Sequence, residues 1–148
     1  MVHATILLAA ALNILSAWPG NWTCVSTSSD GPPIRGSMQA TTYGKWVQFN
    51  GHEPAQNGSP ARSFVMLVAY NAHARKWFID SYSAGGGMIL STSSAGPDAT
   101  RQTWTNIYPV DPNQAPGTIV ATANTWQTYD SWMTKGKRVT EHNACKKT

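Results

Sequence analysis

The sequence predicts a single all-β domain that closes into an antiparallel up-and-down barrel of about 8–10 strands, preceded by an apolar N-terminal segment. The chain of 148 residues is long enough for one domain with a real core. After Ala17 every segment is short, rich in Thr, Val, Trp and Tyr, and broken by Gly or Pro, which is typical of strands and turns. Strands without helical crossovers form an antiparallel meander, and closing a long meander removes its two exposed edges.

The first element is the uncharged apolar run that ends in small residues at Ala17. Its length is that of the apolar region of a secretory signal peptide, whereas a stable transmembrane helix needs about 20 apolar residues. We therefore expect residues 1–17 to be a signal peptide, residues 18–148 to be the barrel domain, and the protein not to insert stably into a membrane. The alternative is a buried or amphipathic first helix of the domain.

The remaining elements are strands separated by turn residues. A hairpin loop at Asn71–Arg75, a glycine-rich reversal at Gly85–Gly87 and a tight turn at Lys135-Gly136 mark the clearest connections. In chain order the expected strands are Asn21–Ser28, Ser37–Tyr43, Lys45–Asn50, Ser63–Asn71, Lys76–Tyr82, Gly87–Thr92, Gln102–Tyr108, Thr118–Thr125, Gln127–Met133 and Lys137–Lys146.

The two cysteines lie on the first and the last expected strands, at Cys24 and Cys145. A disulfide between them would join the strands that must meet when the barrel closes, around a loop of about 120 residues. Disulfides belong to oxidising compartments, so this pairing favours a secreted or periplasmic protein. The alternative is a pair of free thiols in a cytosolic protein. The spacing is not Cys-x-x-Cys and gives little support to metal or redox chemistry.

The residues from Gly20 onwards resemble a known group of barrels. Gly20-Asn21-Trp22 is similar to the Gly-x-Trp signature that opens lipocalin-like, or calycin, barrels. The Trp-x-Cys first strand, the hairpin from Tyr70 to Trp77, and the last hairpin with its Cys-Lys-Lys end resemble small exported bacterial barrels of uncharacterised function. The resemblance spans Gly20 to Lys147 and extends distantly to the haem-binding nitrobindins. It implies that Trp22 points inward and that the interior can hold a small molecule.

Strand alternation then makes Glu141 the strongest candidate for a functional residue. If Trp22 points inward, so does Cys24, and its partner Cys145 places Glu141 on the inner face of the last strand. A carboxyl group among aromatic rings could bind a ligand amine or hydroxyl, or act as a base with a raised pKa. The alternatives are an internal hydrogen bond, an ion pair with an arginine, or a place at the wet mouth of the barrel.

The tryptophans fall on different strands, and large rings that converge inside a barrel either fill it or line a cavity for an apolar ligand. The ligand-binding residues we expect are Trp22, Trp46, Trp77, Trp104, Trp126 and Glu141.

The predicted function is therefore that of an exported, non-enzymatic barrel that binds a small apolar or amphipathic molecule. Three alternatives are a haem-binding barrel, a filled structural barrel without a ligand, and an enzyme that uses Glu141. A haem ligand could come from His142 on the last strand, although alternation places that side chain outside.

The sequence predicts no catalytic residue, no metal site and no nucleic-acid partner. It has no Gly-x-Ser-x-Gly motif, no obvious carboxylate pair and no metal-ligand spacing among its histidines. Its 11 Lys and Arg residues are scattered, apart from a cluster at the carboxyl end, so the net charge of +4 does not form a phosphate-binding stripe. We expect a monomer or a weak dimer.

Overall fold

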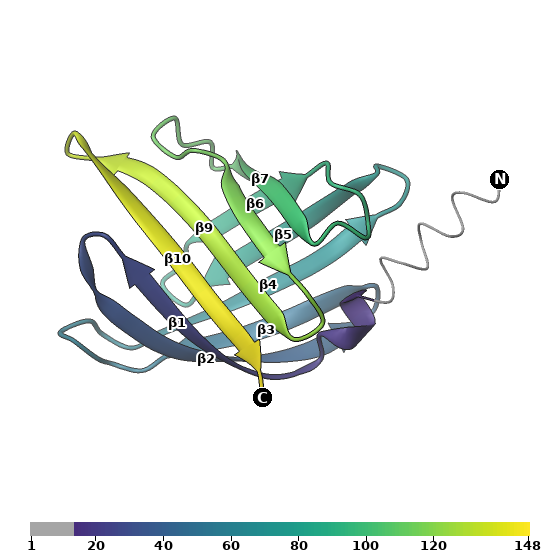
Figure 1. Ribbon diagram of the computed structural model, residues 1–148, viewed down its shortest axis with the longest axis horizontal. Coiled ribbons are helices and arrows are strands. Elements are labelled where there is room, and N and C mark those ends of the chain that lie inside the picture. The colour runs from purple at the N-terminus through teal and green to yellow at the C-terminus, as the bar shows by residue number, and fades with distance from the viewer. Residues whose placement is uncertain (1–13) are drawn as a thin grey trace.

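The computed structural model describes residues 14–148 and shows ten strands in one closed antiparallel barrel, as Figure 1 illustrates. The predicted fold class is therefore confirmed. The strands are β1 (Gly20–Ser28), β2 (Gly31–Tyr43), β3 (Trp46–Glu53), β4 (Arg62–Asn71), β5 (Lys76–Ser83), β6 (Met88–Ser93), β7 (Arg101–Tyr108), β8 (Gly117–Ala121), β9 (Thr125–Thr134) and β10 (Lys137–Lys147).

Each strand pairs with the next along the chain, and β1 also pairs with β10 to close the barrel. Cys24 lies directly opposite Cys145 in that last pairing, and a disulfide joins the two residues across a sequence separation of 121. The predicted disulfide is thus confirmed. It links the two strands that are farthest apart in sequence, where bringing the chain together costs the most entropy.

The expected strand boundaries differ most at β2, which begins at Gly31 rather than at Ser37. Pro32 and Pro33 indicated a loop, because proline has no N–H to donate to a neighbouring strand. In the structure both prolines lie in the exposed first part of β2, where the strand does not require those donors.

A short helix at residues 14–17 covers one end of the barrel, at the right of Figure 1. Leu15 is buried there, and the adjoining Trp18 is only 2% exposed. The Trp18 Nε1–H donates to the Thr122 carbonyl at 2.9 Å, and Lys147 Nζ donates to the Ala17 carbonyl at 2.7 Å. We call residues 14–18 the cap.

The cap bears on the expected signal peptide. Residues 14–17 form a helical turn in which Leu15 belongs to the core cluster and Ile14 packs against it, so cleavage after Ala17 would remove both side chains from this packing. The signal peptide and the buried first helix both stay predictions. The rest of the expected signal peptide, residues 1–13, lies outside the described residues. Within residues 14–148, no helix is long and apolar enough to cross a membrane.

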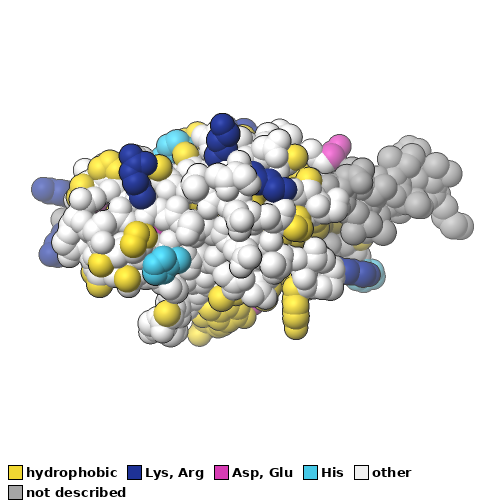
Figure 2. Space-filling view, turned by 90° about the horizontal axis from the view of Figure 1, so that it is seen from below, with side chains coloured by type: hydrophobic (Ala, Val, Ile, Leu, Met, Phe, Trp, Pro, Cys, Tyr) yellow, Lys and Arg dark blue, Asp and Glu magenta, His cyan; other side chains and the backbone are white. Residues whose placement is uncertain are grey.

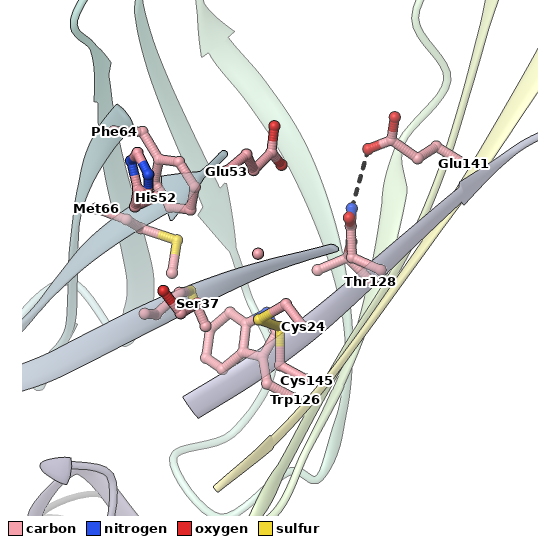
Figure 3. A pocket seen from close by; sticks show the side chains of 13 residues that line it. Cys24, Ser37, His52, Glu53, Phe64, Met66, Trp126, Thr128, Glu141 and Cys145 are labelled. Atoms are coloured by element: carbon pink, nitrogen blue, oxygen red, sulfur yellow. Dashed lines mark hydrogen bonds between the residues drawn. A yellow bond between two sulfur atoms is a disulfide. The ribbon is translucent and has the colours of Figure 1, made fainter. Parts of the chain in front are cut away.

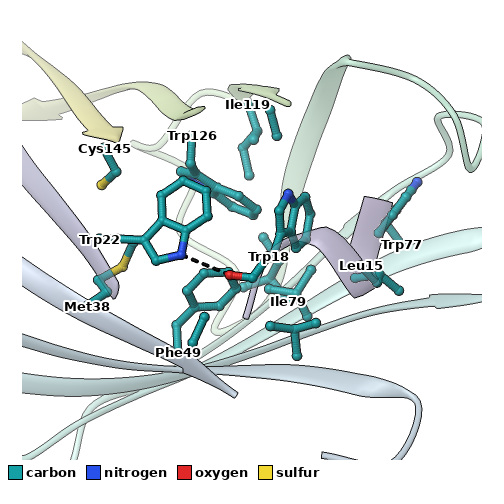
Figure 4. Close-up of a cluster of buried hydrophobic side chains, with 14 of the residues drawn as sticks. Leu15, Trp18, Trp22, Met38, Phe49, Trp77, Ile79, Ile119, Trp126 and Cys145 are labelled. Carbon is teal, nitrogen blue, oxygen red and sulfur yellow. Dashed lines mark hydrogen bonds between the residues drawn. The ribbon is translucent and has the colours of Figure 1, made fainter. Parts of the chain in front are cut away.

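Aromatic rings fill the capped end of the barrel (Figure 4). The Trp18 ring meets that of Trp126 edge-on, with centroids 5.0 Å apart, and Phe49 lies 6.2 Å from Trp22. The Trp22 Nε1–H donates to the Trp18 carbonyl at 3.0 Å, and the Trp77 Nε1–H donates to the Gly96 carbonyl at 3.0 Å. With their polar atoms satisfied, these side chains form a dense core at this end.

Candidate functional site

Beyond the aromatic core, towards the β1–β2 and β9–β10 hairpins, the barrel interior contains two adjoining, partly open pockets, which we call the two lobes of one cavity. The first lobe has a volume of about 260 Å³ and extends along β1 to β4 (Figure 3). The second has a volume of about 370 Å³ and extends along β5 to β8. The wall that both lobes share is formed by Met66, Trp126, Thr128, Glu141 and Asn143.

Two carboxylates lie next to each other at this wall. Glu141 is part of the shared wall, and Asp130 lies beside it in the second lobe. Asp130 of β9 lies directly opposite Glu141 of β10 in the strand register, and both side chains line the second lobe. Asn143 Nδ2 donates to Glu141 Oε1 and to Thr128 Oγ1, both at 3.0 Å. These bonds hold the Glu141 carboxylate in one orientation beside Asp130.

The environment of the pair favours the protonated form of Asp130. Partial burial raises the pKa of this carboxyl, the negative charge of Glu141 raises the pKa further, and a hydrogen bond from Thr128 offsets part of the increase. Two like charges at adjacent cross-strand positions destabilise each other, so the pair favours a proton or another positive charge between its members.

A third carboxylate enters the cavity from the opposite wall. Figure 3 shows Glu53 of β3 across the first lobe from Glu141. Three of the chain's seven acidic side chains therefore line the cavity. In the described part of the chain, no lysine or arginine lines either lobe. The cavity is acidic although the whole chain is basic.

Two glycines leave room for side chains of the cavity wall. A Cβ atom on Gly117 of β8 would lie 2.3 Å from Asp130 Oδ1, and a Cβ atom on Gly51 of β3 would lie 2.1 Å from Phe64 Cζ. Real Cβ atoms do not approach other atoms this closely. Glycine is thus required at both positions if the Asp130 carboxylate and the Phe64 ring are to lie where they do.

The second lobe also contains a buried donor without a partner. Trp104 of β7 is 6% exposed and lines this lobe, and its Nε1–H has no hydrogen-bond partner among the described residues. A buried polar group left unpaired costs about 1–3 kcal/mol. An acceptor atom of a bound molecule would satisfy this N–H.

The six residues predicted to bind a ligand fall into three groups. Glu141, Trp104 and Trp126 line the cavity. Trp22 and Trp77 belong to the filled core at the capped end, where each is 1% exposed. Trp46 lies on the opposite face of β3 from the buried Val47 and Phe49, so the structure does not bring it to the cavity.

The carboxylate pair is the main feature that sequence reasoning missed. No obvious pair was expected, because Asp130 and Glu141 are eleven positions apart and carry no motif. The tight turn at Lys135-Gly136 contained the signal, since it pairs Thr134 with Lys137 and the same register places Asp130 opposite Glu141. Combining the predicted turn with strand alternation would have found the pair.

Two of the described histidines are on strands near the cavity, and they differ in where they lie. His142 is on the outer face, where its ring stacks on Tyr129 with centroids 4.4 Å apart and its Nε2 lies 3.2 Å from Gln127 Oε1. His52 borders the first lobe, but its Nδ1 lies 3.2 Å from the Ser63 hydroxyl oxygen. Within residues 14–148, no group of three or more His, Cys, Asp or Glu side chains is arranged to hold a metal ion.

Comparison with known proteins identifies the fold and no family. No family model matches the sequence, and no curated protein matches it. Among solved structures, a redesigned β-barrel is similar, with a TM-score of 0.52 and 12% identity over 91% of this chain and 95% of that one. A de novo designed fluorescence-activating β-barrel is similar with a TM-score of 0.52 and 11% identity, over 90% and 96% of the two chains. At these identities the likeness supports the barrel fold alone, and the calycin and nitrobindin resemblances stay predictions.

Proposed function

We propose that this protein is an exported, non-enzymatic barrel that binds a small amphipathic molecule in its interior. The observation that carries the proposal is the division of the barrel interior along its axis. One end is filled with aromatic rings, and the space beyond it is a cavity with an apolar floor and polar, acidic walls. Ligand pockets in proteins have this character, with a mostly apolar lining and a few convergent polar groups.

Other features agree with this function. The Cys24–Cys145 disulfide indicates an oxidising, non-cytosolic environment, which supports secretion or a periplasmic location. The resemblance to lipocalin-like barrels adds the expectation of an interior ligand. We propose that the protein works as a monomer or a weak dimer, because the cavity is built within a single chain.

A neutral fluorescent dye tests the proposal directly. N-phenyl-1-naphthylamine added to the disulfide-bonded full-length protein is expected to gain fluorescence and to quench tryptophan emission, because Trp126 lines both lobes. A ligand that binds only the folded state also stabilises it, by about 2.7 kcal/mol at a hundredfold excess over its Kd.

A matched pair of variants locates the dye. Thr128→Phe fills the shared wall of the two lobes and should abolish dye binding. Thr103→Phe places the same ring at an exposed position of β7, on the face opposite Trp104, and should leave binding unchanged. Circular dichroism checks that both variants are folded. If the dye neither binds nor stabilises the wild-type protein, the filled structural barrel becomes the better interpretation.

A further inference from the structure

We infer that the bound molecule is a cation, a small protonated amine with an apolar body, whose ammonium group lies between Asp130 and Glu141. This inference rests on the proposed function and specifies the class of its ligand. It follows from the charges of the cavity wall, from the geometry of the carboxylate pair and from the unpartnered indole of Trp104.

The charges of the cavity wall are not balanced by the protein. Asp130 and Glu141 face each other from adjacent strands, and Glu53 lies across the first lobe. Arg138, three positions before Glu141, lies on the opposite face of β10, and its guanidinium donates to the Ser131 hydroxyl at 3.3 Å. Among the described residues, no lysine or arginine lines either lobe. Positive charge is therefore supplied to the pair by protons or by a ligand.

The geometry of the pair suits a single ammonium group. Side chains directly opposite each other in an antiparallel pair have Cβ atoms about 4.5–5.5 Å apart, so one group with three donors can reach both carboxylates. Asn143 Nδ2 is already engaged by Glu141 Oε1 and Thr128 Oγ1. The remaining acceptor positions of Glu141, and those of Asp130 that the Thr128 hydrogen bond does not use, are available to the ammonium.

The apolar body of the ligand has a defined place beside the pair. Trp126 is 4% exposed and lines both lobes, while Ile79 and Ile119 line the second lobe with Met66. An indole ring next to a bound ammonium also adds a cation–π attraction.

The Trp104 indole is independent support for a ligand in this lobe. Its buried N–H has no hydrogen-bond partner among the described residues, and the Trp104 residue lines the same lobe as Asp130 and Glu141. An oxygen acceptor on the ligand, such as a hydroxyl or a carbonyl, would satisfy it. The structure thus favours an amine that also carries an oxygen acceptor.

The charge of the ligand is set by the acidic cavity rather than by the basic outer surface. In Figure 2 the Lys and Arg side chains are separated from one another over the face shown, and little acidic surface is visible there. A positive surface attracts anions from a distance, but an anion in the cavity would meet three carboxylates. A neutral molecule would leave the repulsion within the pair unrelieved. A cation is the charge class that the cavity stabilises.

Three probes with one carbon skeleton test the inference. Isothermal titration calorimetry on the full-length, disulfide-bonded protein at low ionic strength compares 4-phenylbutylamine, 4-phenyl-1-butanol and 4-phenylbutyrate. We expect the amine to bind at least roughly tenfold more tightly than the alcohol, because hydrogen bonds to charged groups are the stronger ones, and the acid to bind most weakly.

Variants then assign the preference to the pair. Asp130→Asn and Glu141→Gln should each reduce the affinity for the amine by roughly tenfold while changing that for the alcohol by less than about twofold. Asp98→Asn is the matched control, because it removes one exposed carboxylate that lines neither lobe and should leave the amine preference intact. A Trp104→Phe variant should weaken a hydroxyl-bearing amine but not 4-phenylbutylamine, which has no oxygen.

The outcomes separate this inference from the proposed function. If the alcohol or the acid binds as tightly as the amine, or if the neutral dye binds while none of the three probes does, the cation inference is overturned and the function stands. If neither the dye nor any probe binds, the proposed function fails as well. Dye binding by the Asp130→Asn and Glu141→Gln proteins shows that their cavities are intact, so a lost amine preference is then an effect of charge.

Discussion

At the scale of single residues, the Asp130–Glu141 pair is a local cost that the folded protein carries. Burial and the Glu141 charge raise the pKa of Asp130, so the folded protein binds this proton more tightly than the unfolded chain does. The free energy of unfolding therefore falls as the pH rises from the pKa of a free aspartate through the raised pKa, and it levels off above that. A bound cation would remove this repulsion. A purely structural contact would stabilise the protein without a ligand, whereas this pair lowers its stability until a cation binds.

Asp130→Asn should consequently stabilise the ligand-free protein at neutral pH. The gain in unfolding free energy should shrink as the pH is lowered, because wild-type Asp130 is then protonated in both states. Urea denaturation at a series of pH values measures it, with Asp98→Asn as the exposed control. A gain that is absent at neutral pH, or that grows towards acid pH, would contradict the charge argument.

Gly117 provides a steric test of the same carboxylate. In Gly117→Ala the new Cβ would lie 2.3 Å from Asp130 Oδ1, so the carboxylate must move away from its place beside Glu141. We expect little loss of stability, because the atom that must shift is the far end of the Asp130 side chain, together with a weaker preference for 4-phenylbutylamine. Gly31→Ala is the control, since nothing lies within 4 Å of its added Cβ. Unchanged amine affinity in a folded Gly117→Ala protein would falsify the assigned role of Asp130.

At the scale of elements, the cap connects the chain preceding the barrel to the barrel's core. Leu15 and Trp18 are buried against the rings that fill this end, and Lys147 of β10 reaches back to the Ala17 carbonyl. The cap therefore covers one end of the barrel (Figure 1). The cavity lies towards the hairpins at the opposite end.

Leu15→Ala should lower the unfolding free energy of the full-length chain by about 2–5 kcal/mol, the usual cost of removing a buried leucine side chain. Val110→Ala, at a residue that is 76% exposed, should change it by less than about 0.5 kcal/mol. Chemical denaturation measures both. The intact mass of the exported protein then shows whether cleavage after Ala17 removes this contact in the mature form; a mature protein that lacks Leu15 and keeps full stability would show that the cap is dispensable.

At the scale of the whole molecule, stability depends on closing one seam. The β1–β10 pairing joins the first strand to the last, and the Cys24–Cys145 disulfide fixes the register of that pairing. Every other pairing joins strands that are neighbours in sequence. A covalent link across the seam restricts the unfolded chain most, because it closes nearly the whole chain into one loop.

Replacing both cysteines by serine should lower the unfolding free energy by about 2–5 kcal/mol. Urea denaturation of the wild-type protein with and without a reducing agent should show the same difference, and the reducing agent should not affect the double variant. Equal stability of all these forms would mean that the hydrogen bonds and packing of the seam suffice without the disulfide.

The sequence by itself determined the barrel, most of its strands, its disulfide and the inward direction of Glu141. These features follow from local rules, since alternation has a period of two and Gly, Pro and Asn residues mark turns over a few positions. The pairing of Asp130 with Glu141 was also within reach, because a tight turn sets the register of the two strands that it joins.

Only the tertiary structure decided which tryptophans fill the barrel and which line its cavity. Trp22 and Trp126 both point inward, yet Trp22 is packed among rings at the capped end while Trp126 borders both lobes. Alternation predicts the face of a strand that a side chain occupies, but its height along the barrel axis depends on the tilt and stagger of all the strands together. Whether the interior is filled or hollow at a given height depends on side chains from strands far apart in sequence, because they must share one enclosed volume.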